Sequence, residues 1–207
     1  LYAGLFLSGE CETVKRPPII PLIFCAFLAA TPAFANGESG LDVDYAEHLP
    51  LVTESMLLDI THTGDTLVAV GERGHVIHSH DGGEIWAQAE VVPTRATLTT
   101  VTHKAGRLWA GGHDAVIITS GDGGNTWTRQ YHDDERQQAV MDIYFTDENH
   151  GIAMGSYSLY LVTEDGGQTW EDVTIDEEGG YHLNAMVRFE DGRRLIAGEA
   201  GYSYISM

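Results

Sequence analysis

Ser120-Gly121-Asp122-Gly123-Gly124-Asn125-Thr126-Trp127 is one of three copies of a short motif in this chain. The other copies are Ser79–Trp86 and Thr163–Trp170, and the three tryptophans are separated by 41 and then 43 residues. A period of this size, carried by one turn motif, indicates a small β-unit that is repeated in space.

The motif has the composition of a tight hairpin turn. Its two glycines supply the positive φ angles that such a turn requires. The Asp carboxylate can accept hydrogen bonds from nearby backbone N–H groups, and the Ser or Thr hydroxyl can close the same turn. The Trp then buries its ring against a neighbouring sheet. We predict structural roles for all fifteen motif positions: Ser79, Asp81, Gly82, Gly83, Trp86, Ser120, Asp122, Gly123, Gly124, Trp127, Thr163, Asp165, Gly166, Gly167 and Trp170. A carboxylate repeated in every unit is a poor catalytic candidate, since an enzyme needs one asymmetric site.

The repeat extends upstream of the motif. A glycine lies fifteen residues before each Trp, at Gly71, Gly112 and Gly155, between two short apolar runs. Alignment on the Trp places Leu57–Ile60 opposite Leu98–Val101 and Met141–Tyr144. Each unit therefore reads as four short strands joined by tight turns. The predicted repeats are 57–97, 98–140, 141–183 and an incomplete 184–207.

A four-stranded unit of about 40 residues has the dimensions of a β-propeller blade. We predict an all-β fold over residues 36–207, with three blades and part of a fourth in an open arc. A closed propeller needs typically 4–8 blades. We interpret the chain as a fragment of a longer protein; the alternative is a short protein that closes by oligomerising.

The N-terminal residues 1–35 have the order of a secretory signal. Lys15-Arg16 precede the apolar run Ile19–Ala30, and Ala33-Phe34-Ala35 resembles a cleavage site. Cleavage near Ala35–Asn36 predicts export to a periplasm or a thylakoid lumen, with an uncleaved anchor as the alternative. Both cysteines, Cys11 and Cys25, precede this point, so no disulfide is expected after cleavage.

The chain is strongly acidic, with a formal net charge of −20. This balance argues against nucleic acid or an anionic lipid surface as the main partner. The sequence predicts no metal site. In His75-Val76-Ile77-His78-Ser79-His80, strand alternation sends His75 to the face opposite His78 and His80. No small-molecule cofactor is predicted either.

The motif Ser-x-Asp-Gly-Gly-x-Thr-Trp resembles the Asp-box, or bacterial neuraminidase repeat. The longer pattern from Leu57–Ile60 through Gly71 to Ser79–Trp86 is similar to the photosystem II stability and assembly factor family. This resemblance implies an exported, non-enzymatic propeller that binds a protein partner, within a membrane-associated or envelope complex. Because sialidases also carry Asp-boxes, a glycoside hydrolase or another carbohydrate-active propeller is the alternative function.

Candidate binding residues lie in two sets of loops, which vary between repeats. One set follows the repeat glycine and the other links successive blades. Loops of this kind carry the recognition surface in many folds. The candidates are Glu72, Arg73, Arg95, His113, Asp114, Arg136, Tyr157, His182 and Glu199, and no catalytic residue is predicted.

Overall fold

The computed structural model describes residues 43–133, 135–175 and 180–206. The predicted signal sequence and cleavage site lie outside these residues. In the described part, no helix is both long enough and apolar enough to span a lipid bilayer.

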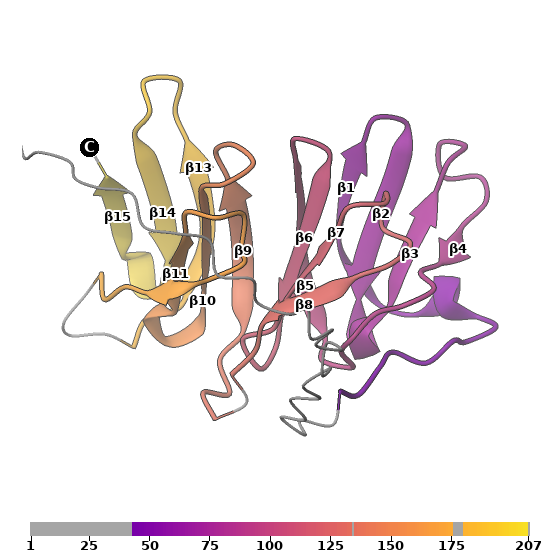
Figure 1. Ribbon diagram of the computed structural model, residues 1–207. Helices are drawn as coiled ribbons and strands as arrows, with labels where there is room; N and C mark the ends of the chain where they lie inside the picture. The colour runs from indigo at the N-terminus through magenta and orange to yellow at the C-terminus, as the bar shows by residue number, and fades with distance from the viewer. Residues whose placement is uncertain (1–42, 134, 176–179, 207) are drawn as a thin grey trace, which may run out of the picture. The chain divides into compact units, whose positions relative to one another are not determined.

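The described chain forms four antiparallel sheets, each built from strands that follow one another in sequence (Figure 1). Blade 1 contains β1 (Leu57–Thr63), β2 (Thr66–Gly71), β3 (Val76–Ser79) and β4 (Ala87–Gln88). Blade 2 contains β5 (Leu98–Lys104), β6 (Arg107–Gly112), β7 (Ile117–Ser120) and β8 (Thr128–Tyr131). Blade 3 contains β9 (Val140–Phe145), β10 (Gly151–Gly155), β11 (Tyr160–Thr163) and β12 (Glu171–Asp172). Blade 4 contains β13 (Leu183–Arg188), β14 (Arg194–Gly198) and β15 (Ser203–Ser206).

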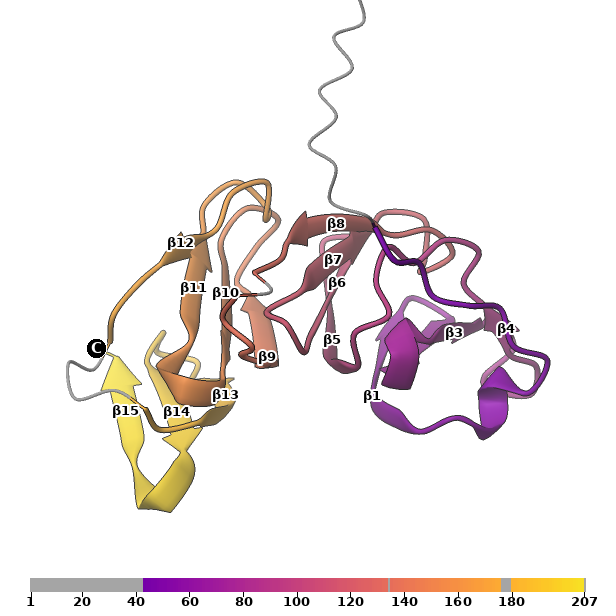
Figure 2. The ribbon, with the colours of Figure 1, turned by 90° about the horizontal axis from the view of Figure 1, so that it is seen from below.

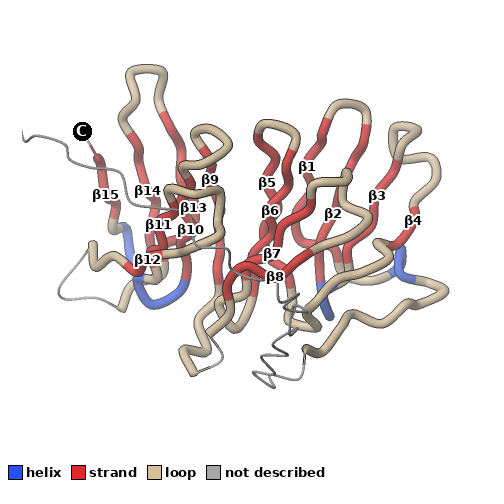
Figure 3. The backbone as a smooth tube through the Cα atoms, viewed as in Figure 1, coloured by secondary structure: helices blue, strands red, loops and turns tan. Residues whose placement is uncertain are grey.

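The predicted all-β architecture, an open propeller of three four-stranded blades and part of a fourth, is confirmed. Figure 3 shows that the helices among the described residues are single turns. These are η1 (Val52–Glu54), η2 (Glu72–Gly74), η3 (Ser156–Ser158) and η4 (Glu199–Gly201). Three of them follow the repeat glycine, at Gly71, Gly155 and Gly198.

Strand register corrects the predicted alignment of the third repeat. Leu57 pairs with Gly71, but Val140, not Met141, pairs with Gly155. The reason is that the β9–β10 hairpin holds one more residue than the β1–β2 hairpin. The structural counterpart of Asp59 is therefore Asp142.

The hydrophobic core lies between the blades rather than within any one of them. In blades 2 and 3, which have a neighbour on each side, the second strand of the sheet is buried on both faces, as the stacking of repeat units requires. Between blades 1 and 2 the core contains Val68, Val70, Leu98 and Val101; between blades 2 and 3, Trp109, Ile117, Val140 and Ile143; between blades 3 and 4, Met154, Leu183 and Ile196.

The first strand of each blade contacts the first strand of the next, and Figure 2 shows β1, β5, β9 and β13 on one side of the sheets. Hydrogen bonds join these inner strands. The Asp59 carboxylate accepts from the Val101 N–H at 2.8 Å, and the Asp142 carboxylate accepts from the Met186 N–H at 2.7 Å. Between blades 2 and 3 the Thr99 hydroxyl instead donates to the Val140 carbonyl.

The Asp142 carboxylate is partly buried in the junction between blades 3 and 4. Burial raises the pKa of Asp142, and the charge of Asp59 acts in the same direction, while the N–H groups of Met186 and Ile143 oppose both. Asp142 is therefore held in the junction at an electrostatic cost that its hydrogen bonds offset only in part.

Each Asp-box turn is closed by its own side chains. In blade 1 the Ser79 hydroxyl donates to Asp81 at 2.7 Å and accepts from the Gly83 N–H at 2.9 Å. The Asp81 carboxylate accepts the backbone N–H of Ile85 at 2.9 Å, and this bond, with the one from Ser79, lowers the pKa of Asp81. Asp122 and Asp165 hold the corresponding turns of blades 2 and 3. Burial alone would raise the pKa of Asp122, but hydrogen bonds from Thr126, Ser120 and Asn125 bring it down to about 2.

One core position of blade 1 breaks the apolar pattern. His75 is 1% exposed, and neither ring nitrogen has a hydrogen-bond partner in the described part of the chain. The carbonyl of His75 accepts the N–H of the repeat glycine. The carbonyls of Val116 and Leu159 do the same in blades 2 and 3, so these residues are the counterparts of His75. Burial lowers the pKa of His75 from 6.5.

We expect His75→Leu to raise the free energy of unfolding by about 1–2 kcal/mol at neutral pH, because a buried polar group without a partner is costly. The unfolded chain takes up a proton on His75 below its ordinary pKa of 6.5, whereas the folded chain resists protonation there. Wild-type stability therefore falls as pH drops below this value, and the advantage of the variant grows. Urea denaturation at about pH 7.5 and about pH 5.5 measures both effects; a variant less stable than wild type at both values contradicts the prediction.

Candidate functional site

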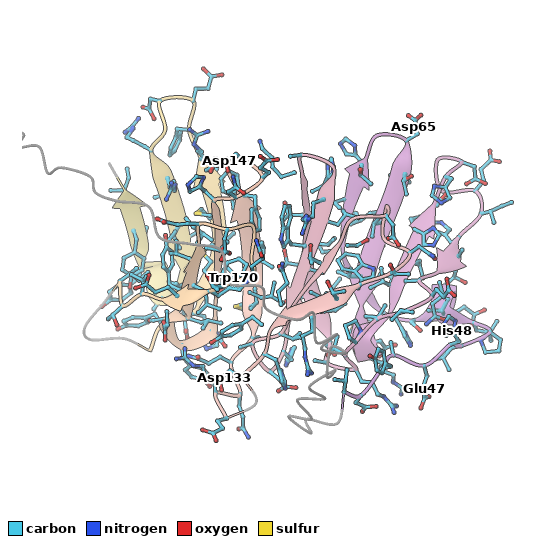
Figure 4. All side chains as sticks on the ribbon, viewed as in Figure 1. Glu47, His48, Asp65, Asp133, Asp147 and Trp170 are labelled. Carbon is cyan, nitrogen blue, oxygen red and sulfur yellow. The ribbon has the colours of Figure 1, made fainter. Side chains whose placement is uncertain are left out.

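The topology brings all the predicted loop residues to one end of the sheets. Neighbouring strands are antiparallel, so the turns after the second strands and the links between blades emerge at the same end. We call this end the link face. The opposite end, the box face, carries the Asp-box turns and the first hairpins. Figure 4 shows Asp65 and Asp147 on hairpins at the box face and Asp133 and Glu47 at the link face.

Three side chains that directly follow the repeat glycine hold the start of an inner strand. Glu72 accepts from the Met56 N–H at 3.1 Å, Ser156 from the Ala139 N–H at 2.7 Å, and Glu199 from the His182 N–H at 3.2 Å. These contacts give Glu72 and Glu199 a structural role in blades 1 and 4. His113 occupies the same position in blade 2 and is exposed.

The two predicted link arginines are held in ion pairs. Arg95 lies 3.1 Å from Glu47 and 3.7 Å from Asp44, in the segment before blade 1. Arg136 pairs with Asp133 at 2.8 Å and with Asp172 of β12. These contacts tie the links to neighbouring segments. Exposed Arg73 and Asp114 both adopt left-handed backbone angles with φ of 57°.

Three predicted residues meet around a pocket of about 490 Å³ at the inner edge of the link face. His113, Tyr157 and His182 come from three different blades or links. The Tyr157 and His182 rings make an edge contact at 4.9 Å, and the Gln138 amide donates to the Tyr157 carbonyl at 3.1 Å. The remaining lining is Leu58, Thr99, Gln137, Ala139, Met141, Ser156 and Asn184.

Four of these lining residues occupy equivalent positions in the four blades, and none of them is among the predicted binding residues. Each inner strand carries a bulge at its second residue, where pairing with the next strand skips one position. The bulged residues are Leu58, Thr99, Met141 and Asn184. A bulge redirects a side chain out of the regular alternation, and here all four bulged residues line the pocket. Their signal in the sequence is a position that varies between repeats beside the nearly constant apolar Leu57, Leu98, Val140 and Leu183.

The chemistry of the pocket contrasts with that of the chain. The protein has a net charge of −20, yet the described lining contains no Asp, Glu, Lys or Arg. Apolar Leu58 and Met141 lie among amides, imidazoles and hydroxyls that can both donate and accept hydrogen bonds. This combination suits an uncharged segment of polypeptide better than a phosphate or a metal ion.

A second, smaller pocket of about 200 Å³ lies between blades 3 and 4, beside Gly151, Ile152 and Arg194. Between blades 2 and 3 the corresponding place is filled by an Asp-box turn, since Trp109 donates its indole N–H to the Gly166 carbonyl at 3.1 Å. Strand register makes Ile152 the counterpart of Trp109. The smaller pocket therefore lies at the position that a box turn occupies between blades 2 and 3, and we assign it no ligand.

Histidines do not gather into a ligand set in the described part of the chain, where no group of three His, Cys, Asp or Glu side chains is placed to hold a metal ion. His78 and His80 are in ring contact at 5.1 Å. Burial lowers the pKa of His78, and the neighbouring His80 acts in the same direction.

The four sheets and the box turns define an Asp-box β-propeller. The family described as photosynthesis system II assembly factor YCF48 matches residues 40–136 and 130–202. The chain belongs to this family.

Curated relatives match shorter stretches of the chain. The photosystem II assembly lipoprotein Ycf48 of Synechococcus sp. (strain CC9902) is 37% identical over 69 residues, which are 32% of this chain and 20% of the relative. The protein of the same name from Prochlorococcus marinus is 43% identical over 53 residues, 25% of this chain and 16% of the relative. These matches therefore span at most a fifth of the relatives.

Solved structures agree in fold. YCF48 from Cyanidioschyzon merolae superposes with a TM-score of 0.58 at 24% identity, covering 77% of this chain and 55% of that one. A structure described as YCF48 bound to D1 peptide gives 0.60 at 17% identity, covering 73% and 50%. A GH74 xyloglucanase from Xanthomonas campestris gives 0.53 at 18% identity, covering 70% and 27%, so the fold also occurs in a glycoside hydrolase.

Proposed function

We propose that this protein is an exported, non-enzymatic assembly factor that binds a segment of a membrane-protein partner at the inner pocket of the link face. Membership of the YCF48 family supports a role in photosystem II assembly. The main support for this binding site is the uncharged, partly apolar lining of the pocket, on a chain that is strongly acidic.

The bound segment is an extended, uncharged stretch of polypeptide. Asn184 and Gln137 offer amides for its backbone, and Leu58 and Met141 offer an apolar surface for one of its side chains. A relative has been solved with a D1 peptide, which supports a peptide as the ligand class. The signal sequence predicted before Asn36 would deliver the protein to the lumenal or periplasmic side of such a complex, and the naming of curated relatives as lipoproteins supports export.

The alternative of a carbohydrate-active enzyme gains no specific support from this pocket. Glycoside hydrolysis uses a pair of carboxyl groups beside the scissile bond, and the described lining of the pocket contains none. The resemblance to a xyloglucanase is one of fold, which hosts many functions.

We expect Tyr157→Ala to weaken binding of a fluorescently labelled D1 peptide roughly tenfold, a loss of about 1.4 kcal/mol. Tyr157 is 60% exposed at the pocket, and an aromatic ring of this kind is a common anchor for a partner. Tyr45→Ala is the matched control, because Tyr45 is 52% exposed and lies outside the pocket lining.

Fluorescence anisotropy with the wild type and both variants measures the effect. If both variants weakened peptide binding equally, the pocket could not be the binding site. Absence of any D1 peptide binding by the wild type would remove this peptide as the ligand.

A further inference from the structure

A histidine side chain is buried in the junction between blades 1 and 2. His78 of β3 is 8% exposed and pairs across the sheet with Val68, whose side chain packs in the core shared with blade 2. Residues paired across two strands lie on one face of a sheet, so the His78 ring faces blade 2. Its Nδ1 atom is buried and has no hydrogen-bond partner among the described residues.

A second histidine faces the same junction from the other side. His103 of β5 pairs with Leu108, which packs in the core between blades 1 and 2. The His103 ring therefore faces blade 1. Its Nε2 atom is buried, and the part of the chain that the structure describes offers it no hydrogen-bond partner. The junction thus holds two imidazoles, one from each blade.

The next junction, between blades 2 and 3, holds other residues at these two positions. Strand register makes Thr119 the counterpart of His78. Phe145 is likewise the counterpart of His103. The Thr119 hydroxyl donates to a carbonyl of β6 at 2.8 Å, and Phe145 stacks on Trp109. Neither of these side chains gains a proton between about pH 5 and about pH 8, whereas an imidazole does.

The groups around His78 act on its proton in both directions. His80 lies in ring contact at 5.1 Å, and Asp122 and Asn125 of the second box turn lie nearby. Burial lowers the pKa of His78 and the charge of His80 acts in the same direction, while the two box-turn residues oppose them. The Asp122 carboxylate is already occupied by the N–H groups of its own turn.

The groups around His103 all act in one direction. Burial lowers its pKa, and so do the neighbouring His62 of β1 and Lys104. The ordinary pKa of both junction histidines is 6.5. Below this value a ring in water takes up a proton, whereas a ring in the closed junction resists it. Acid therefore favours any form of the protein in which the two rings are exposed.

We propose that the junction between blades 1 and 2 is an acid-sensitive joint, which opens in mildly acidic solution while the other junctions stay closed. Opening brings the rings of His78 and His103 into water, where each takes up a proton. Each ring that resists a proton shifts the opening equilibrium by up to about tenfold per pH unit below its ordinary pKa, so the two rings give up to about a hundredfold over one unit.

The junction between blades 3 and 4 responds in the opposite sense. It holds the Asp142 carboxylate, whose pKa is raised by burial. Acid relieves an electrostatic cost at this carboxylate instead of adding one. The response to acid is therefore specific to the junction that contains the two histidines.

Opening would also change the pocket of the link face. Leu58 comes from blade 1 and Thr99 from blade 2, so the movement separates two walls of the pocket. We expect a peptide bound there to be released in acid. This consequence, unlike the opening itself, rests on the function proposed above.

Amide hydrogen exchange followed by NMR tests the opening at single positions. The Val101 N–H binds Asp59 across the junction of blades 1 and 2, and the Met186 N–H binds Asp142 across the junction of blades 3 and 4. Exchange rates are corrected for the intrinsic effect of pH. Protection of Val101 should then fall at least about tenfold, and up to about a hundredfold, between about pH 7.5 and about pH 5.5. Protection of Met186 should not fall.

Variants that carry the residues of the neighbouring junction locate the effect. The double variant His78→Thr/His103→Phe should lose the acid response at Val101 and remain protected there at neutral pH. His150→Gln is the matched control and should keep the full response, because the His150 side chain is 59% exposed on the β9–β10 hairpin. His75→Leu should keep it as well. Its counterpart Val116 packs on the side of blade 2 that faces blade 1, so His75 lies on the side of blade 1 away from the junction.

Three results would overturn the proposal. The first is equal protection of Val101 at both pH values in the wild type. The second is a full acid response in the double variant. The third is an equal loss of protection at Val101 and Met186, which would mean that the whole chain unfolds.

Fluorescence anisotropy with the labelled D1 peptide tests the consequence for the pocket. Wild type and double variant keep the same pocket histidines, so only the junction distinguishes them. We expect acid to weaken binding more in the wild type, and equal weakening in both would overturn the link between joint and pocket. A wild type that binds no peptide at about pH 7.5 would instead remove the proposed function, while the exchange measurement still decides whether the junction opens.

Discussion

Trp109→Ala is expected to lower the free energy of unfolding by about 3–5 kcal/mol, the usual cost of truncating a fully buried aromatic side chain. Trp109 is 0% exposed between blades 2 and 3. Its ring stacks on Phe145 with centroids 3.7 Å apart, and its indole N–H binds the Gly166 carbonyl of the third box turn. The substitution removes packing from both partners and takes away one of the two donors of that carbonyl, leaving only the Gln130 amide at 3.2 Å.

The position of Trp109 makes the effect larger than that of a terminal site. The junction that it fills is the middle one of three, and in repeat proteins stability depends on the contact between neighbouring units. We expect the variant to unfold in two steps, with blades 1 and 2 separating from blades 3 and 4. Trp86→Ala is the control, since Trp86 is only partly buried and packs against the small cluster of Val52, Ala69 and Ile77. Denaturant unfolding followed by circular dichroism measures both variants, and an equal loss for the two would contradict this account.

The repeated turn allowed the blade architecture to be predicted from sequence because its residues act locally. Asp122 and Ser120 close a turn within a few residues of themselves, so their spacing carries the geometry. The register of the third inner strand was predicted wrongly, because alignment on Trp170 does not detect the longer β9–β10 hairpin. Only pairing with Gly155 shows that Val140 is the counterpart of Leu57.

The candidate site could be predicted only in part, because some of its contacts depend on how strands pair and not on local sequence. His113, Tyr157 and His182 were predicted from variable loops, and the structure places them around one pocket. Glu72 and Glu199 looked equally variable, but their carboxylates accept inner-strand N–H groups, a contact between residues that are far apart in sequence. The bulged residues could not be predicted as lining residues, because a bulge depends on pairing between strands and no particular residue type marks it in the sequence.

The repeat glycine is the sequence feature whose role the structure explains most directly. At Gly155 an added Cβ would lie 1.8 Å from the Ala139 carbonyl oxygen, and at Gly71 it would lie 2.0 Å from the Met56 carbonyl oxygen. Gly155 has an extended φ of −178°, which any residue can adopt, so the requirement is for space and not for an unusual backbone angle. The carbonyl that approaches so closely also accepts the Ser156 N–H, which fixes the inner strand to the turn.

We therefore expect Gly155→Ala to destabilise the fold by about 3 kcal/mol, the upper end of the usual cost of overpacking, because the obstructing atom is backbone and cannot rotate away. Gly121→Ala is the control, since no atom lies within 4 Å of the added Cβ and the substitution should change stability little. Gly198→Ala should fall between them, because its nearest contact, the His182 carbonyl oxygen, is at 3.1 Å. Thermal and urea unfolding of the three variants should give this order of stability. If Gly155→Ala proved as stable as Gly121→Ala, the close approach of inner strand and turn could not be the reason for the glycine.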